Sequence, residues 1–206
     1  MNQKTISIQD PDSLNIALSA LLKGEVIVIP TDTVYGLACL ASNTSAIEKI
    51  YQSKGRDFSK ALPVIISHYS QLSLIADKVT DAAKKVMDHF WPGALTLVIP
   101  KHHSLPPALT SLPTVGVRMP NHPWLLELIN HSGPLASTSA NISGAKSPVS
   151  VAEAVEQLQG KVIYFFDGGP CIGGISSTVV DFSKPDPVLL REGQITYKEI
   201  QTVVNS

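Results

Sequence analysis

The sequence excludes several classes of protein through what it has little of. Its two cysteines, Cys39 and Cys171, form neither a Cys-x-x-Cys pair nor a disulfide framework, which argues against a zinc site and favours a reducing compartment. A formal net charge of −1 gives no overall attraction to nucleic acid or to an anionic membrane. No apolar run is long enough for a signal peptide or a membrane span. These absences predict a cytoplasmic protein without a membrane partner.

The common catalytic and phosphate-binding motifs are also missing. The chain has no Gly-x-x-x-x-Gly-Lys-Ser/Thr loop, no Gly-x-Gly-x-x-Gly and no Gly-x-Ser-x-Gly. Its six histidines lack His-x-x-x-His spacing, and the pair His102–His103 lies in a Pro-rich stretch, 101–113, for which a solvated loop is expected. We therefore expect no metal ligands from protein side chains. Catalysis is not excluded, because nucleotidyl transfer can proceed by positioning and charge stabilisation.

Helical and strand patterns alternate along the 206 residues, of which 44% are hydrophobic, enough to form a core. We predict a single α/β domain, residues 1–206 with a core of about 12–194, built on a twisted mixed sheet flanked by helices. Antiparallel pairs are expected near the end, where no helices join the strands. The expected strands are 5–8, 26–29, 62–66, 94–99, 115–119, 162–166, 177–181 and 187–190. The expected helices are 13–23, one from 43 or 44 to 54, one from 80 to 90, 123–129 and 150–158.

One stretch, 26–36, combines a buried strand with a polar end. Four β-branched residues at 26–29 predict a strand buried on both faces, and Pro30 ends it. Thr31, Asp32 and Thr33 follow. Ligands bind at strand ends in open α/β sheets, so this cluster is either a turn that satisfies its own backbone or the lip of a binding site.

Hydroxyls and cations gather at the predicted strand ends, whereas carboxylates there are scarce. This set suits an anionic ligand with several oxygens, because arginine forks onto carboxylate or phosphate and lysine acts as a point charge. The hydroxyl residues are Thr31, Thr33, Thr114, Ser137, Thr138, Ser139, Ser176, Ser177 and Thr178. The cationic residues are Lys54, Arg56, Lys60, Arg118 and Arg191.

Each part of this set also has an ordinary structural explanation. Lys54 and Arg56, taken alone, are better explained as an exposed helix end, where cations interact favourably with the helix dipole. Arg118 in an apolar strand needs either a structural carboxylate or a ligand anion. Arg191 could pair with its neighbour Glu192 or a nearby loop. The segment 137–141 could be a polar turn or a helix cap.

Seven segments, taken in order, resemble the YrdC-like family of threonylcarbamoyl-AMP synthases. They are Pro30-Thr-Asp-Thr-Val-Tyr-Gly36, Lys54-Gly-Arg56, Trp91-Pro-Gly93, Val117-Arg-Met-Pro120, Ser137-Thr-Ser-Ala-Asn-Ile-Ser-Gly144, Ser177-Thr-Val-Val-Asp181 and Arg191-Glu-Gly193. The resemblance covers nearly the whole chain and corresponds to the short, single-domain form. It implies a twisted α/β sheet around a concave, basic cavity.

The resemblance also implies a reaction. Members of the family are nucleotidyltransferases that make L-threonylcarbamoyladenylate and pyrophosphate from L-threonine, bicarbonate or CO₂, and ATP. Mg²⁺ would arrive with the nucleotide rather than in a protein cage. The product supports the N6-threonylcarbamoyladenosine modification of tRNAs that read codons beginning with A. The expected partners are ATP, L-threonine, bicarbonate and the downstream tRNA threonylcarbamoyltransferase proteins, with a tRNA contact as a further candidate.

Carried over by position, the resemblance assigns two sets of residues. The L-threonine site would comprise Thr33, Arg118, Ser139 and Ser177, with Arg118 on the carboxylate. The ATP site would comprise Lys54, Arg56, Lys60, Thr114, Asn141, Ser147 and Arg191, with Lys54 and Arg56 also stabilising charge in catalysis.

The segment after Arg56 departs from the family pattern. Asp57 replaces a frequent proline, Ala61 replaces the proline of a Pro-Leu pair, and Ile65 or Ile66 stands where many members have histidine. The loop could therefore close on ATP differently. Two alternatives remain: a non-enzymatic RNA-binding or ribosome-maturation paralogue with the same fold, and a carbamoyl-adenylate domain of hydrogenase-maturation type. Aromatic residues make up only 6%, which argues against a broad RNA surface.

Overall fold

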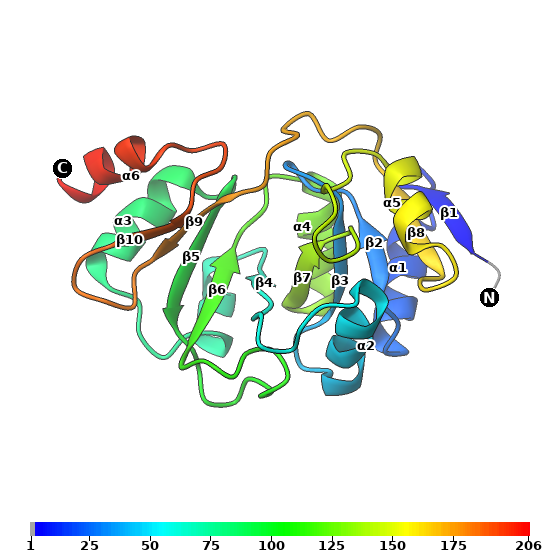
Figure 1. Cartoon of the computed structure of the whole chain (residues 1–206), viewed down its shortest axis with the longest axis horizontal. Coiled ribbons are helices and arrows are strands. Elements are labelled where there is room, and N and C mark those ends of the chain that lie inside the picture. Colours follow the sequence, from blue (N-terminus) through cyan, green and yellow to red (C-terminus); the bar gives the residue numbers. More distant parts are fainter. Residues whose placement is uncertain (1–2) are drawn as a thin grey trace.

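A single mixed sheet forms the frame of the protein in the computed structural model, which describes residues 3–206 (Figure 1). Ten strands follow the order β1-β8-β2-β3-β7-β4-β6-β5-β9-β10. Their bounds are β1 Lys4–Ser7, β2 Ile27–Ile29, β3 Gly36–Leu40, β4 Val64–Ile65, β5 Leu95–Pro100, β6 Thr114–Arg118, β7 Leu135–Ser139, β8 Tyr164–Asp167, β9 Thr178–Asp181 and β10 Val188–Arg191. The predicted α/β fold with a mixed sheet and flanking helices is confirmed.

The helices begin where the sequence supplies capping side chains. Asn43, Thr80 and Ser150 each accept a hydrogen bond from the backbone N–H three residues on, as predicted for three helix starts. The six α-helices are α1 Ser13–Leu22, α2 Thr44–Lys54, α3 Asp81–Phe90, α4 Pro123–Ser132, α5 Val151–Leu158 and α6 Tyr197–Val204, and a 3₁₀ helix, η1, covers Tyr69–Leu74. None of these helices is both long and apolar enough to cross a membrane.

The central strands are buried on both faces, as the run of β-branched residues predicts. Ile27, Val28 and Ile29 in β2 are all fully buried. Val28 packs into the larger of two apolar clusters, while Ile27 and Ile29 pack into the smaller one, because successive side chains of a strand point to opposite faces. The smaller cluster includes α1 and α4, which supply Leu21, Leu128 and other residues.

The last strands behave as expected, but several elements differ from the prediction. β9 and β10 form the predicted antiparallel pair. β3 is an unpredicted strand that turns back antiparallel to β2 and also pairs with β7. The strand expected at 62–66 is only Val64–Ile65, although Leu62 and Ile66 still form backbone hydrogen bonds to neighbouring segments. α6 lies beyond the expected core and begins with a capping box between Thr196 and Glu199.

Candidate functional site

A cavity of about 330 Å³, lined by hydroxyls, arginines and apolar side chains, lies where the middle strands of the sheet meet. Its size is at the lower end of the range for small-molecule sites. Among the residues that the structure describes, no aspartate or glutamate lines it. The hydroxyl residues that line it are Thr31, Thr33, Thr96, Ser137, Thr138, Ser139, Ser176 and Ser177, and the cationic ones are Arg56, Arg118 and Arg191. This lining suits an anionic ligand with several oxygens.

The turn between β2 and β3 is both a self-satisfied turn and part of the cavity wall. The Thr31 hydroxyl accepts hydrogen bonds from the backbone N–H groups of Thr33 and Val34, at 3.1 and 3.2 Å, and donates to the Val34 carbonyl at 2.7 Å. Thr33 is 1% exposed, and its hydroxyl lies 3.0 Å from that of Thr31. The turn alternative is confirmed, and Thr31 and Thr33 of the cluster also line the cavity, as the binding-site alternative requires.

Arg118, at the end of β6, is the most constrained cation of the cavity. Its Nη2 donates to Asp32 Oδ1 at 2.5 Å, its Nη1 to Thr33 Oγ1 at 2.9 Å, and its Nε to the Gly93 carbonyl at 2.9 Å. Burial lowers the pKa of Arg118, and the adjacent Asp32 carboxylate raises it. The partner that this arginine requires is thus a structural carboxylate. Its two terminal nitrogens each keep one further hydrogen to donate.

Arg191 approaches the same cavity from β10. Its Nε and Nη2 donate to the Ser177 carbonyl at 3.1 and 2.8 Å. The Ser177 hydroxyl lies 2.9 Å from that of Thr96. Burial and the nearby charge of Arg118 both lower the pKa of Arg191. Two guanidinium groups that repel each other across a cavity favour an anion between them.

Arg56 faces the cavity from the segment that follows α2. Its Nη2 donates to the Ala61 carbonyl at 3.1 Å and its Nε to the Lys60 carbonyl at 3.3 Å. Burial lowers the pKa of this guanidinium. The turn that it holds is also tied by Asp57, whose carboxylate accepts from the Ser59 backbone N–H at 2.8 Å.

Lys54 contradicts the interpretation of an exposed helix end. It is the last residue of α2, yet it is 1% exposed, because α2 packs its C-terminus against the end of β7. Its Nζ donates to the backbone carbonyls of Ser139 and Asn141. Burial, with a smaller effect of the Arg56 charge, lowers the pKa of Lys54 to about 7. Lys54 therefore holds the cavity segment 139–141 from behind and does not itself line the cavity.

The structure brings together part of the predicted site. The predicted residues that line the cavity are Thr33, Arg56, Arg118, Ser139, Ser177 and Arg191. All four residues assigned to L-threonine are in this group. The predicted residues outside the lining are Lys54, Lys60, Thr114, Asn141 and Ser147.

The predicted ATP residues outside the lining have other surroundings. Lys60 is exposed and Ser147 is half-buried. Thr114 pairs with Pro100 at the start of β6. Asn141 is buried and donates to the carbonyls of Ile142 and Ala145, both at 2.8 Å. Thr96 lines the cavity although the sequence interpretation did not include it; a single hydroxyl within the apolar strand 94–99 was the available signal.

Comparison with known proteins gives consistent matches over nearly the whole chain. The Sua5/YciO/YrdC family model, described as "Telomere recombination", matches residues 19–193. The threonylcarbamoyl-AMP synthase of Bacillus subtilis is 44% identical over 202 residues, which are 97% of this chain and 58% of that protein.

Two solved structures share the fold. The structure of Pyrococcus abyssi Sua5 complexed with L-threonine superposes with a TM-score of 0.92 at 37% identity, covering 98% of this chain and 61% of that one. Escherichia coli YciO superposes with a TM-score of 0.86 at 28% identity, covering 97% of this chain and 100% of that one. The chain thus spans less than two thirds of the B. subtilis and P. abyssi proteins.

Proposed function

Because the chain belongs to the Sua5/YciO/YrdC family, as the resemblance in its sequence predicts, we propose that it is an L-threonylcarbamoyladenylate synthase, a nucleotidyltransferase. The observation that carries this proposal is the cavity, where three arginines and eight hydroxyl side chains, with no carboxylate among the described residues, form much of the lining. Such a lining matches an amino-acid carboxylate together with a polyphosphate. The substrates are L-threonine, bicarbonate or CO₂, and ATP.

L-Threonine binds, in this proposal, at the inner end of the cavity. Arg118 receives its carboxylate through the remaining hydrogens on Nη1 and Nη2, since Asp32, Thr33 and Gly93 fix the guanidinium plane. Ser139 and Ser177 also line the cavity, and we assign their hydroxyls to the amine and the side-chain hydroxyl of threonine. The pocket has to distinguish threonine from serine by one methyl group, which supports discrimination on the order of 10–200-fold.

ATP binds at the side of the cavity bounded by Arg56 and Arg191. The other proposed ATP residues are Lys60, Thr114, Asn141 and Ser147, none of which lines the cavity. Mg²⁺ enters as the metal–ATP complex. The absence of carboxylates from the described lining fits an ion held by phosphates and water, and the Asp32 carboxylate is already paired with Arg118.

The chemistry then requires no general base from a dedicated side chain. The threonine ammonium releases a proton to solvent, and the free amine adds to CO₂ and gives up a second proton to solvent, which leaves a carbamate. A carbamate oxygen attacks the α-phosphorus of ATP, the bond to the β-phosphate oxygen breaks, and pyrophosphate leaves. Two anions must approach each other, so their repulsion is the main barrier. Arg56, Arg118 and Arg191 offset it, because fixed cations in a partly desolvated site stabilise developing charge without reorganisation.

Lys54 contributes to this proposal as a positioning residue as well as a charge near the ATP site. Its contacts with the Ser139 and Asn141 carbonyls hold one wall of the threonine pocket against α2. The product would pass to tRNA threonylcarbamoyltransferase proteins for N6-threonylcarbamoyladenosine formation, which places the proposed activity in the cytoplasm. A direct tRNA contact is a further proposal.

The decisive experiment is a pyrophosphate-release assay with ATP, Mg²⁺, bicarbonate and L-threonine, each omitted in turn, with the product identified by mass. Release that requires both threonine and bicarbonate, with threonylcarbamoyl-AMP as the product, is the expected result. A folded protein that binds ATP without any release would refute the synthase proposal. Binding to RNA with a steep salt dependence and no ATP turnover would instead favour the RNA-binding alternative.

Variants connect this activity to the cavity. Arg56→Ala should lower turnover at least about tenfold, the scale of one lost charge-assisted contact. Lys54→Ala should do the same by releasing the 139–141 segment. The matched control is Lys84→Ala, because Lys84 is an exposed lysine on α3 outside the cavity lining. Near-normal turnover in both Arg56→Ala and Lys54→Ala would contradict the roles proposed for these two residues.

A further inference from the structure

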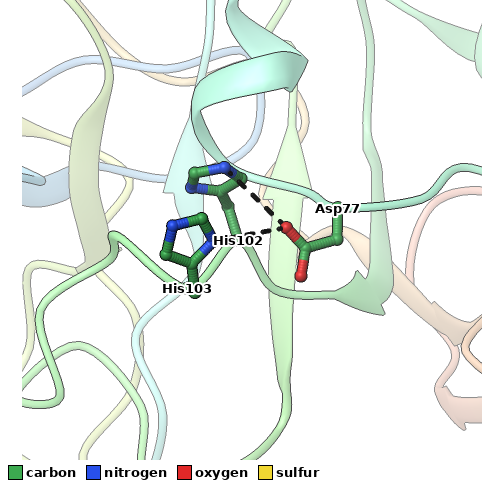
Figure 2. Close-up of side chains that lie close together, drawn as sticks. All are labelled: Asp77, His102 and His103. Atoms are coloured by element: carbon green, nitrogen blue, oxygen red, sulfur yellow. Dashed lines mark ion pairs between the residues drawn. The ribbon is translucent and has the colours of Figure 1, made fainter.

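Away from the cavity, three side chains with metal-binding atoms converge on the surface (Figure 2). Asp77 follows η1, and His102 and His103 follow β5. Asp77 Oδ1 lies 3.8 Å from His102 Nε2 and 3.9 Å from His103 Nδ1. The three ligand atoms all lie within 4.8 Å of one another. None of these residues lines the cavity.

The two segments that carry these side chains are joined through their backbones. The His102 N–H donates to the Ile75 carbonyl at 2.8 Å, and the Asp77 N–H donates to the Pro100 carbonyl at 3.3 Å. Ala76 and Lys101 form an isolated antiparallel bridge between these two contacts. The cluster is therefore built on a paired scaffold, although its members are far apart in the sequence.

A local turn directs both histidines toward the aspartate. In an extended strand neighbouring side chains point to opposite faces. Here the Leu105 N–H donates to the His102 carbonyl at 3.2 Å, and the chain turns at this point. The two imidazole rings consequently lie on the same side, with their centroids 4.2 Å apart. Figure 2 shows both rings facing the Asp77 carboxylate.

Ser104 orients one of the rings. Its hydroxyl lies 2.7 Å from His102 Nδ1, which leaves Nε2 of that ring toward Asp77. The Ser104 backbone N–H also donates to this Nδ1, at 3.3 Å. A metal-binding histidine donates the hydrogen of its second ring nitrogen, so metal binding through Nε2 requires the tautomer in which Nδ1–H donates to the Ser104 hydroxyl and the bond from the Ser104 N–H is given up. Lys101, the nearest cation in sequence, donates to the Thr110 carbonyl at 2.9 Å and does not pair with the Asp77 carboxylate.

The spacing of the three atoms points to an ion between them. Distances of 3.8 and 3.9 Å are too long for hydrogen bonds. Ligand atoms around a tetrahedral zinc ion lie about 3.3 Å apart, given bonds of about 2.0–2.1 Å. The three atoms, all within 4.8 Å of one another, would have to move closer on binding an ion, and the exposed side chain of His103, 84% accessible, has room to move.

We propose that Asp77, His102 and His103 bind one divalent transition-metal ion, with Zn²⁺ as the reference ion and water completing its coordination. Two imidazoles and one carboxylate suit zinc, nickel or copper, whereas Mg²⁺ and Ca²⁺ prefer oxygen ligands. The ion would fasten the 101–113 segment to the residues after η1. This inference does not depend on the synthase activity.

The test uses the full chain without an affinity tag, freed of metal by a chelator, and titrated with ZnCl₂ in a calorimeter. We expect one ion per chain, a change in the ring resonances of both histidines in NMR spectra, and a rise in the unfolding temperature of at least about 2 °C. Asp77→Asn and His103→Ala should each weaken binding at least about tenfold, since even outer-shell substitutions typically cost 10–100-fold.

The matched control is His89→Ala, because His89 is an exposed histidine beside an aspartate on α3. This variant should bind Zn²⁺ with unchanged affinity. The proposal is overturned if binding is absent up to about 1 mM Zn²⁺, a concentration at which only very weak sites stay empty. It is also overturned if His103→Ala binds as tightly as the parent chain, or if equimolar Mg²⁺ displaces the ion.

Discussion

Arg118 offers the sharpest test of the proposed threonine pocket, through the substitution Arg118→Lys. The guanidinium uses Nε, Nη1 and Nη2 to reach Gly93, Thr33 and Asp32, and keeps one hydrogen on each terminal nitrogen for a carboxylate. A lysine ammonium retains the charge but has three donors and no fork. It cannot satisfy the three protein acceptors and also bind a substrate carboxylate through two bonds.

The expected loss follows from the number of bonds. A hydrogen bond to a charged group contributes about 1.5–3 kcal/mol, so losing one of two such bonds should raise the KM for L-threonine about 10–100-fold. The KM for ATP should change less than about threefold, because Arg118 does not bind the nucleotide in this proposal. The assay is pyrophosphate release with threonine and ATP varied separately.

A second arginine provides the matched control. Arg191→Lys alters the same kind of side chain at the same cavity, but Arg191 is assigned to ATP. It should therefore raise the KM for ATP by a larger factor than the KM for threonine, which changes only through the loss of bonds to Ser177. If Arg118→Lys raised the KM for ATP instead, or if neither variant changed either KM by more than twofold, the assignment of the two arginines would be wrong.

Three further predictions concern stability and the shape of the cavity. Asp32→Asn should lower the free energy of unfolding by about 3 kcal/mol, measured by urea denaturation, because it leaves Arg118 as a buried cation without a carboxylate; an unchanged midpoint would refute this. Lys54→Met should flatten the pH dependence of stability. The pKa of Lys54 is lowered to about 7 in the folded chain. Above that pH the folded chain has lost the Lys54 proton, whereas the unfolded chain still keeps it. Because the unfolded chain then binds more protons, Lys54 makes the parent chain more stable as pH rises from about 7 to 8.5. Equal slopes for variant and parent over that range would contradict the burial argument. Gly116→Val should raise the KM for substrate, and this rise, converted to free energy, should exceed the loss of unfolding free energy. An added Cβ at this lining position already approaches Pro63 Cβ to 3.2 Å and Thr96 Cγ2 to 3.3 Å. Binding and melting measurements would separate the two effects.

Local patterns predicted the helix starts and the buried strands because these depend on neighbouring residues. Capping by Asn43, Thr80 and Ser150 needs only the next turn of the helix. β3 was not predictable in this way. Its sequence, Gly-Leu-Ala-Cys-Leu, has little intrinsic strand preference, and its conformation comes from pairing with β2 and with β7 on its other side.

The site shows the same division between local and long-range causes. The residues of the threonine set could be assigned because motif positions carry them, whereas the burial of Lys54 could not be foreseen. Its acceptors are carbonyls at 139 and 141, 85 and 87 residues away. The Asp77 cluster was missed for the same reason, because histidine spacing alone does not reveal a third ligand from another segment.

The cavity itself follows from an unusually short strand at the centre of the sheet. β4 has two residues, and it joins β7 on one side to β6 on the other, as Figure 1 shows. On either side of these two residues single backbone bonds continue the pairing: the Pro63 carbonyl accepts from the Ser137 N–H at 2.9 Å, and the Ile66 N–H donates to the Arg118 carbonyl at 2.9 Å. The sheet can therefore open into a cavity at this point without losing its buried backbone hydrogen bonds.

This origin explains why the proposed ligand contacts come from both halves of the sheet. Thr33 and Ser139 belong to the half containing β2, β3 and β7, whereas Arg118 and Ser177 belong to the half containing β6 and β9. A bound amino acid would connect the two halves across the short strand β4, adding polar contacts where few backbone hydrogen bonds join the strands. Binding energy would then also order the centre of the sheet, since a ligand that binds only the folded arrangement stabilises it. Amide exchange in β4 and at the facing ends of β6 and β7 should accordingly slow when threonine is added, while exchange in β1, at the far edge, stays unchanged.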